Sequence, residues 1–242
     1  MIRVENVLIT YYDRKKSESS EFQVENIHFI LEKGEVLGII GRNGCGKTTL
    51  LKSLVGLKGR DAGEVEYDGL FLGKDNKQIK EKIAFVSHEW LFDLNTQVKT
   101  IRDFYGSFYS NFDRKKFDEL CEQFEIYSKS TGMLMSLGEK AKLSLILALS
   151  RNPEVLIMDE PLSNLDPVVR AEIMDLLRDY MADGEKNIIY STHMIHELEQ
   201  IADKILYMKN GKQEMCMDMN EIQDTYFAGR RVDLEELFEI FA

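Results

Sequence analysis

Hydrophobic residues occur along the chain in two alternating patterns. The first is a short, nearly continuous apolar run, typical of a strand whose two faces are both covered. The second is an apolar stripe with helical spacing, typical of an amphipathic helix. The apolar runs occur at residues 35–40, 82–87, 154–160 and 187–192, and the helical stripes at 48–57, 167–184 and 194–204. Because strand and helix alternate, the pattern predicts an α/β fold built on a buried sheet.

The remaining apolar segments of the two ends favour strands joined by turns. Residues 3–12 and 21–31 predict two strands joined by a polar loop, and residues 63–70 alternate as a further strand. A final hairpin is expected at 204–217, turning at an Asn-Gly pair. These segments predict an N-terminal antiparallel β subdomain and a sheet of mixed direction.

Residues 88–150 differ from the segments on either side. They are rich in aromatic residues and helix formers, which predicts a helical subdomain inserted into the α/β core. The core is therefore expected to span residues 1–87 and 151–218. An acidic helical tail is expected from 219 to 242. Together these parts predict a single domain.

Composition narrows the classes of function. The chain has 242 residues and a formal net charge of −11, and such an acidic chain is a poor candidate for nucleic-acid binding, which needs basic faces. We expect no nucleic-acid partner. The cysteines Cys45, Cys121 and Cys216 are widely spaced and indicate neither a disulfide framework nor a metal cluster. The richest apolar run, at 143–150, is far shorter than the ~20 residues of a membrane span, so a membrane role would come through a partner.

The segment GRNGCGKT, residues 41–48, matches the phosphate-loop pattern G-x-x-x-x-G-K-[ST] between a predicted strand and a predicted helix. Glycines let the backbone turn its N–H groups toward phosphate oxygens, and the helix start adds unpaired N–H groups. Lys47 is expected to reach the β- and γ-phosphates, and Thr48 to supply an oxygen to Mg²⁺. The expected nucleotide-binding residues are Gly41, Asn43, Gly44, Cys45, Gly46, Lys47, Thr48 and Thr49. Cys45 fills a variable position of the pattern and is not expected to be a nucleophile.

Two adjacent carboxylates close the apolar run VLIMDEP, residues 155–161. Asp159, at the end of the predicted strand, can hold Mg²⁺ through a water molecule. Glu160 projects further and can polarise a water molecule for attack on the γ-phosphate. The pair therefore predicts a hydrolytic site with separate roles for metal and proton chemistry.

Three further motifs stand in order with these two, namely SLGEK at 136–140, SNLD at 163–166 and STH at 191–193. The set resembles the nucleotide-binding subunit of ABC transporters, from Val4 to about Lys212. In finer detail it resembles the bacterial single-domain exporter ATPases of the antibiotic- and peptide-export group. The resemblance implies a P-loop NTPase with a RecA-like core, ATP and Mg²⁺ as its ligands, and ATP hydrolysis coupled to transport, in this case export.

The resemblance also implies partners. Two ATPase subunits, forming a homodimer or a heterodimer, would pack head to tail around two ATP molecules. Transmembrane permease subunits would hold the dimer at the cytoplasmic face of the cell membrane. A short helix of the permease would enter a groove lined by Trp90, Phe92 and Leu94. Taken singly, each of these side chains fits the core of the helical subdomain equally well.

In the resemblance, SLGEK is the signature that contacts the ATP of the other subunit, through Ser136, Gly138 and Glu139. The usual family form is S-G-G-Q, so Leu137 and Glu139 depart from it. S-x-x-E is also a capping box, in which the glutamate bonds back to the cap residue. Because a carboxylate aimed at ATP would be repelled, we expect Glu139 to point back. Leu137 restricts the backbone beside the phosphate and puts the efficiency of the contact in doubt.

Other family positions are carried over in the same way. His193 matches the switch histidine, which would hydrogen-bond the γ-phosphate and help to position Glu160 and the water. Asp166 matches the loop that crosses the dimer interface, and it is also expected to cap the helix at 167–184. Tyr11 is the preferred residue for stacking on adenine, with Tyr12 as the second choice.

The largest departure lies at His88, where the family usually carries a glutamine that contacts Mg²⁺ and senses the membrane partner. A neutral imidazole could accept a hydrogen bond from metal-bound water, and Glu89 could take this role instead. Two rival functions follow from these features. An ABC-type ATPase of translation or DNA repair is disfavoured, since the chain has neither a second ATPase domain nor a long coiled-coil insertion. A regulatory subunit with little hydrolysis stays open.

Overall fold

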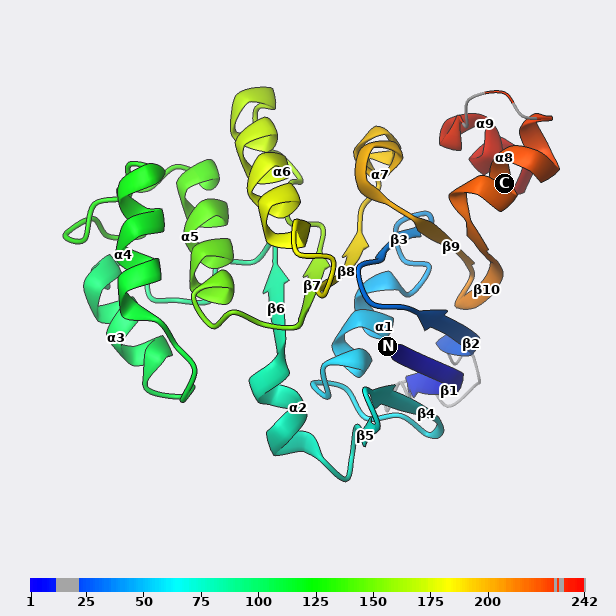
Figure 1. The fold of residues 1–242 in the computed structure, drawn as a ribbon, viewed down its shortest axis with the longest axis horizontal. Coiled ribbons are helices and arrows are strands. Elements are labelled where there is room, and N and C mark those ends of the chain that lie inside the picture. Colours follow the sequence, from blue (N-terminus) through cyan, green and yellow to red (C-terminus); the bar gives the residue numbers. More distant parts are fainter. Residues whose placement is uncertain (12–21, 229, 231–232, 242) are drawn as a thin grey trace, which may run out of the picture.

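The computed structural model describes residues 1–11, 22–228, 230 and 233–241. In this part of the chain ten strands and nine helices form one α/β domain (Figure 1). The strands are β1 Ile2–Tyr11, β2 Phe22–Leu31, β3 Val36–Ile40, β4 Ala62–Tyr67, β5 Leu70–Phe71, β6 Ile83–Ser87, β7 Val155–Asp159, β8 Asn187–Ser191, β9 Lys204–Lys209 and β10 Lys212–Asp218. The helices are α1 Lys47–Leu54, α2 Asn76–Lys82, α3 Val98–Gly106, α4 Arg114–Gln123, α5 Leu137–Leu149, α6 Pro167–Met181, α7 Ile195–Ile201, α8 Met219–Phe227 and α9 Leu234–Phe241.

The strands form one mixed sheet in the order β5-β4-β1-β2-β10-β9-β3-β8-β7-β6. The N-terminal strands β1, β2, β4 and β5 pair antiparallel, whereas the central strands β6, β7, β8, β3 and β9 pair parallel. The two parts meet where β10 lies parallel to β2, with Lys212 opposite Glu25. The predicted α/β class, mixed sheet and antiparallel N-terminal strands are therefore confirmed.

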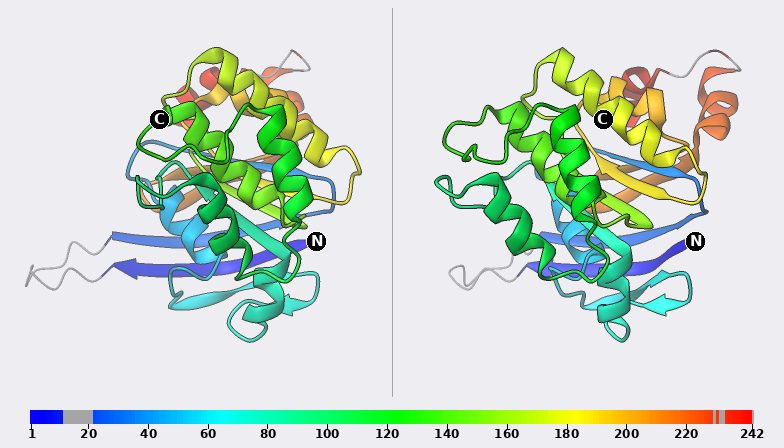
Figure 2. Two further views of the ribbon diagram at one scale, coloured as in Figure 1. Left: turned by 90° about the vertical axis from the view of Figure 1, so that its left-hand side faces the viewer. Right: turned by 60° about the vertical axis from the view of Figure 1, so that its left-hand side comes forward.

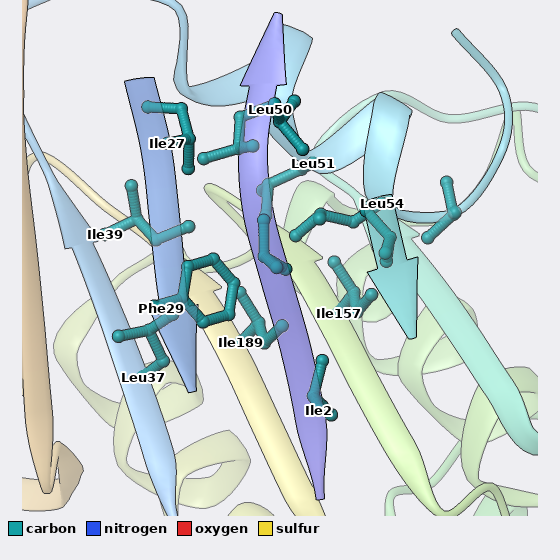
Figure 3. Close-up of a cluster of buried hydrophobic side chains, with 14 of the residues drawn as sticks. Ile2, Ile27, Phe29, Leu37, Ile39, Leu50, Leu51, Leu54, Ile157 and Ile189 are labelled. Atoms are coloured by element: carbon teal, nitrogen blue, oxygen red, sulfur yellow. The ribbon is translucent and has the colours of Figure 1, made fainter. Parts of the chain in front are cut away.

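Three buried clusters hold the layers together. Helix α1 lies between the antiparallel strands and the central strands, and its Leu50, Leu51 and Leu54 are fully buried there (Figure 3). Residues of α5 to α9 cover the opposite face of the central strands (Figure 2). A third cluster lies among α3, α4 and α5, which form the end of the molecule farthest from β1 in Figure 1. The middle of the chain therefore has its own helical core, as predicted.

Several predicted elements have different bounds in the structure. Residues 63–70 do not form one strand, because Asp68 (φ 47°) and Gly69 (φ 83°) make a tight turn between β4 and β5. Two successive positive φ values are the geometry of a type I′ hairpin. Helix α2 was not predicted, since its only buried apolar residue is Ile79. The polar loop between the first two strands, and Tyr12, lie outside the described residues.

The terminal elements follow the predicted signals closely. The turn of the last hairpin is Asn210 (φ 48°) and Gly211 (φ 83°), again of the I′ form. Helix α6 begins at Pro167 behind its cap Asp166, and Gly184 (φ 69°) follows its end. The described part of the tail is helical. No helix in the described part of the chain is both long and apolar enough to cross a bilayer.

Candidate nucleotide-binding site

The phosphate loop lies between the fully buried strand β3 and the start of α1. A Cβ atom on Gly41 would lie 2.3 Å from the carbonyl oxygen of Met208, and one on Gly46 would lie 2.6 Å from the Cγ2 atom of Val24. Both glycines have positive φ, 153° and 109°, so β9 and β2 leave room only for glycine at these positions. No side chain caps the start of α1. Its first N–H groups are therefore available to an anion, as phosphate binding requires.

The side chain of Lys47 lies inside this loop. It is 5% exposed, and its Nζ donates a hydrogen bond to the carbonyl of Gly41 at 2.7 Å. Nζ also lies 3.7 Å from Oε1 of Glu160. Cys45 is buried beside it, and burial raises the pKa of the Cys45 thiol. A thiol held protonated supports the expectation that Cys45 is a packing residue and not a nucleophile.

The carboxylate of Asp159 ends β7 and is 1% exposed. It accepts a hydrogen bond from Ser191 Oγ at 2.7 Å, so β8 fixes its orientation. The sequence motif STH alone assigns no role to Ser191. Its role follows from the position of its hydroxyl on β8, the strand next to β7. Pairing of these two strands places Asp159 opposite Ser191.

Glu160 and His193 lie together beyond the ends of these strands. Oε2 of Glu160 is 2.8 Å from Nδ1 of His193. Glu160 has a left-handed backbone (φ 48°), which costs a residue with a Cβ about 1–2 kcal/mol. Its N–H donates to the carbonyl of Ser191 at 3.0 Å, which holds this conformation. The structure thus brings Lys47, Glu160 and His193, which come from three separate motifs, into one cluster.

Two oxygen-bearing side chains next to this cluster, Thr48 and Asp159, could contribute to a cation site. Among the described residues no group of three or more His, Cys, Asp or Glu side chains could hold a metal ion. Thr48 is exposed in the first turn of α1, and Asp159 is fixed at the end of β7. Mg²⁺ prefers few protein ligands, with waters and phosphate oxygens completing its shell. The residues present therefore fit Mg²⁺ bound together with a nucleotide.

Tyr11 lies at the end of β1 and contacts the start of α1, directly after the phosphate loop. Its hydroxyl is 3.2 Å from Oγ1 of Thr49, and its ring is 41% exposed. The Lys58 ammonium lies 4.0 Å from the ring centroid, so a cation covers part of this ring. The position of Tyr11 next to the loop is compatible with an adenine contact, and this role stays a prediction.

The signature residues lie on the helical subdomain, at the start of α5. Ser136 Oγ accepts the N–H of Glu139 at 3.2 Å, and Glu139 Oε2 accepts the N–H of Ser136 at 2.8 Å. The predicted capping box is confirmed, and the Glu139 side chain points back to the cap. A Cβ on Gly138 would lie 3.0 Å from Cγ2 of Val169, so this glycine lets α5 approach α6. Leu137 is 63% exposed.

Asp166 caps α6, since its carboxylate accepts the N–H groups of Val168 and Val169 at 3.0 and 3.1 Å. The expected cap is confirmed, while the role at a dimer interface is untested. His88 and Glu89 follow β6 and are exposed. The His88 N–H donates to the carbonyl of Asp159 at 3.2 Å. The usual glutamine position therefore lies beside the candidate metal site, whichever of the two side chains acts there.

Trp90 and Phe92 are partly buried against the core of the helical subdomain, with ring centroids 5.3 Å apart. They serve that core at least in part, as the alternative interpretation held. A pocket of about 250 Å³ lies next to Trp90. Its lining includes His88, Glu89, Leu137, Lys140, Ser163 and Asn164. The pocket thus lies between the glutamine position, the signature helix and the SNLD loop.

Known protein sequences are similar to this chain. Residues 24–163 match the sequence family described as ABC transporter. The ABC transporter ATP-binding protein YtrB of Bacillus subtilis is 28% identical over 84% of this chain and 69% of its own length. The Nod factor export ATP-binding protein I of Rhizobium sp. (strain N33) is 32% identical over 82% and 67%. The methionine import ATP-binding protein MetN of Carboxydothermus hydrogenoformans is 29% identical over 88% and 64%. The chain thus spans about two thirds of the length of these relatives.

Solved structures share the fold. One described as the ATP-binding subunit of an ABC transporter has a TM-score of 0.84 at 21% identity, over 98% of this chain and 97% of that one. A dimeric ATP-binding cassette in a post-hydrolysis state, bound to ADP and phosphate, has a TM-score of 0.78 at 23% identity, over 90% and 98%. Because the family match covers more than half of its residues, the chain belongs to the ATP-binding subunits of the ABC transporter family and is an ABC-type ATPase.

Proposed function

We propose that the chain is the motor subunit of an ABC exporter, working in a head-to-tail dimer that drives transmembrane partner subunits. The observation that supports this proposal most is the cluster of Lys47, Glu160 and His193, with contacts of 3.7 and 2.8 Å around one carboxylate. A regulatory subunit with little hydrolysis would not need this arrangement. The cluster is suited to attack of water on a terminal phosphoryl group.

Each residue has a defined task in this mechanism. Lys47 and the N–H groups at the start of α1 bind the phosphates, and Lys47 then exchanges its bond to Gly41 for phosphate oxygens. Glu160 orients the attacking water and accepts its proton. When both ring nitrogens of His193 carry protons, one N–H donates to Glu160 and the other to the γ-phosphate. Thr48, and Asp159 through water, would hold Mg²⁺, which would supply charge stabilisation in the transition state.

Completion of the site requires a second subunit in this proposal. Ser136 caps α5 and Gly138 lies in its first turn. The helix packs on β6, α4 and α6, and these two residues would contact the ATP of the other subunit. Asp166 would lie at the same interface, and Val168 beside it is 69% exposed. A second copy of this chain or a related ATPase subunit would serve equally well. A solved structure with the same fold, described as a dimeric ATP-binding cassette, supports dimer formation.

The permease would dock on the helical subdomain near Trp90 and Phe92. Between and beyond these two half-buried rings, Leu91 is 73% exposed and Leu94 is 44% exposed. These leucines offer free apolar surface for the partner helix, while the two rings form its floor. The subunit would then be held peripherally at the cytoplasmic face of the membrane. Relatives are named for export and for import, so the export direction rests on the finer sequence resemblance.

Capture of membrane partners tests this proposal. The Glu160→Gln variant should bind ATP without turnover and hold the dimer closed, so a pull-down from detergent-solubilised native membranes with ATP and Mg²⁺ should recover a polytopic membrane protein. The matched control is the Glu160→Gln, Lys47→Ala double variant, which should recover much less because it binds ATP weakly. Recovery of ribosomes or only soluble proteins would contradict the transport role. Sequencing the captured partner also identifies the transport system and its direction.

A further inference from the structure

Glu197 is a buried carboxylate in α7, one helical turn after His193. It is 5% exposed. A charge is costly to bury unless hydrogen bonds or ion pairs offset the loss of water. Its partners are Tyr190 in β8, Thr192 directly before His193, and Arg170 of α6, which in turn contacts the loop before Asp166.

One oxygen of Glu197 holds the loop that carries His193. Oε2 accepts hydrogen bonds from the hydroxyl of Tyr190 and from Oγ1 of Thr192, the latter at 3.2 Å. Thr192 Oγ1 in turn accepts the N–H of Met194 at 2.9 Å. Burial, and next the Glu197 carboxylate, hold the pKa of Tyr190 well above its usual range, so the tyrosine stays a donor. The residues on both sides of His193 are therefore fixed through Glu197.

The other oxygen of Glu197 faces the SNLD loop, residues 163–166, through Arg170 of α6. Arg170 Nε lies 3.2 Å from Oε1 of Glu197. Its Nη2 donates a hydrogen bond to the carbonyl of Leu165 at 2.9 Å, directly before Asp166. Neither Nε nor Oε1 has a hydrogen-bond partner in the described chain, because the two atoms are close but not aligned. This contact is the loosest link between the two loops.

We propose that Arg170 and Glu197 are positioning residues that couple the SNLD loop to His193. When the SNLD loop seats against a second subunit, the carbonyl of Leu165 moves the forked Arg170 side chain, and Glu197 transfers that movement to the turn around His193. Hydrolysis is thereby favoured only in a closed dimer. The inference rests on the proposed roles of His193 and of the SNLD loop.

The chemistry of the link supports coupling over packing alone. Apolar side chains of similar volume join two helices as well as a buried ion pair, and often better. Here Glu197 bonds to Tyr190 and Thr192 at the end of β8, and Arg170 bonds to Leu165 in the SNLD loop. Arginine holds a carboxylate and a carbonyl at a fixed spacing through its rigid planar fork, whereas lysine carries all its donors on one atom of a flexible stem.

Two substitutions cut the link while leaving most of the fold intact. In Glu197→Gln the neutral amide oxygen is a weaker acceptor for Tyr190 and Thr192 than the carboxylate, while the NH₂ group faces Arg170 and breaks the ion pair. Arg170→Lys keeps the positive charge but removes the fork in which Nε faces Glu197 while Nη2 bonds to Leu165. We expect either change to lower kcat for ATP hydrolysis about 10-fold or more, with KM for ATP within about 2-fold. The double variant should be no slower than the slower single variant.

A second measurement does not depend on activity. Hydrogen–deuterium exchange of the chain alone should be faster in Glu197→Gln than in wild type at both 163–166 and 192–194. Tyr180→Phe is the matched control, because Tyr180 lies on α6 together with Arg170. The change removes the hydrogen bond from the Tyr180 hydroxyl to the carbonyl of Pro153. It should lower thermal stability without changing kcat or the exchange of either loop.

The outcomes separate this inference from the proposed function. Wild-type kcat and exchange in Glu197→Gln, with activity lost in His193→Ala, would overturn the coupling and keep the catalytic cluster. Multiplicative effects in the double variant would also overturn it, because independent residues do not share one path. Full activity in His193→Ala would contradict the proposed function itself.

Discussion

The phosphate loop and the signature segment, which we propose to contact ATP from two different subunits, are built differently. The phosphate loop is clamped between buried strands, where Met208 and Val24 leave no space for a Cβ at Gly41 and Gly46. The signature begins a well-capped helix on the helical subdomain, and the residues around it are exposed and apolar. Met133, Leu134 and Leu137 are 63%, 79% and 63% exposed.

The two segments differ in whether their side chains find partners within the chain. Around the phosphate loop, Lys47, Glu160 and His193 satisfy one another within the chain. At the signature, the capping box satisfies the helix end, yet the exposed leucines remain without cover in the described part of the chain. Apolar side chains gathered on a surface typically mark an interaction site. The comparison therefore favours one half-site that is preassembled in the subunit and another that is completed by a second subunit.

The largest effect is expected from removing Lys47. Lys47→Ala should lower ATPase turnover by about 100-fold or more, because phosphate charge then loses its buried cation. Ser136→Ala should impair the signature of the other site. If the two half-sites act between subunits, mixing the two inactive variants should restore part of the turnover, since a mixed dimer contains one intact pair of half-sites. Turnover is measured as phosphate release.

The mixing experiment has a direct control. In the control, both substitutions are combined in one chain, and this double variant is mixed with wild type. In a mixed dimer the wild-type phosphate loop then faces a mutated signature, and the wild-type signature faces a mutated phosphate loop. No mixed dimer therefore contains a complete ATP site. The turnover of this mixture should not exceed that of the wild-type fraction alone. Absence of any recovery when Lys47→Ala is mixed with Ser136→Ala would show that the half-sites do not act between subunits.

A smaller effect tests the signature by itself. Ser136→Ala should cost about 1 kcal/mol of unfolding free energy through loss of the cap, and at least about 10-fold in turnover, while ATP binding to the isolated subunit is unchanged. Asp113→Ala is the matched control, because Asp113 caps α4 in the same subdomain through the N–H groups of Lys115 and Lys116. It should give a similar stability loss at normal turnover. Equal turnover losses in both variants would reduce Ser136 to a helix cap.

The sequence predicts a strand or helix correctly where the local pattern of residues is distinctive. The strands β3, β7 and β8 were predictable because every residue in them is buried, which produces continuous apolar runs. The α6 start was predictable from Asp166 and Pro167. Strand β5 and helix α2 were not predicted, since neither has a regular spacing of apolar residues. Only the two successive positive φ values at Asp68 and Gly69 separate β5 from β4.

The candidate site shows the same limit. Motif order identified Lys47, Glu160 and His193, yet their convergence depends on strand pairing across the sheet, which no local pattern contains. Ser191 acquires a partner only because β7 and β8 are adjacent. Glu197 resembles any other glutamate on a helix until its burial is known. Trp90 and Phe92 illustrate the reverse case, where aromatic character alone could not separate core from surface.

The smallest expected effect concerns Glu139, the signature residue that departs most in charge. Its carboxylate accepts the N–H of Ser136 at 2.8 Å, so it faces the helix start and not the surface that would meet ATP. Glu139→Gln keeps this acceptor and loses only the favourable charge at the N-terminus of α5, worth about 0.3–1 kcal/mol. We expect unfolding free energy to fall by no more than that amount and turnover to stay within about 2-fold. Thermal or chemical unfolding and phosphate release measure the two quantities. A large rise in turnover would instead mean that the carboxylate leaves its cap and repels ATP, which would remove the distinction between a self-satisfied helix start and a surface awaiting its partner.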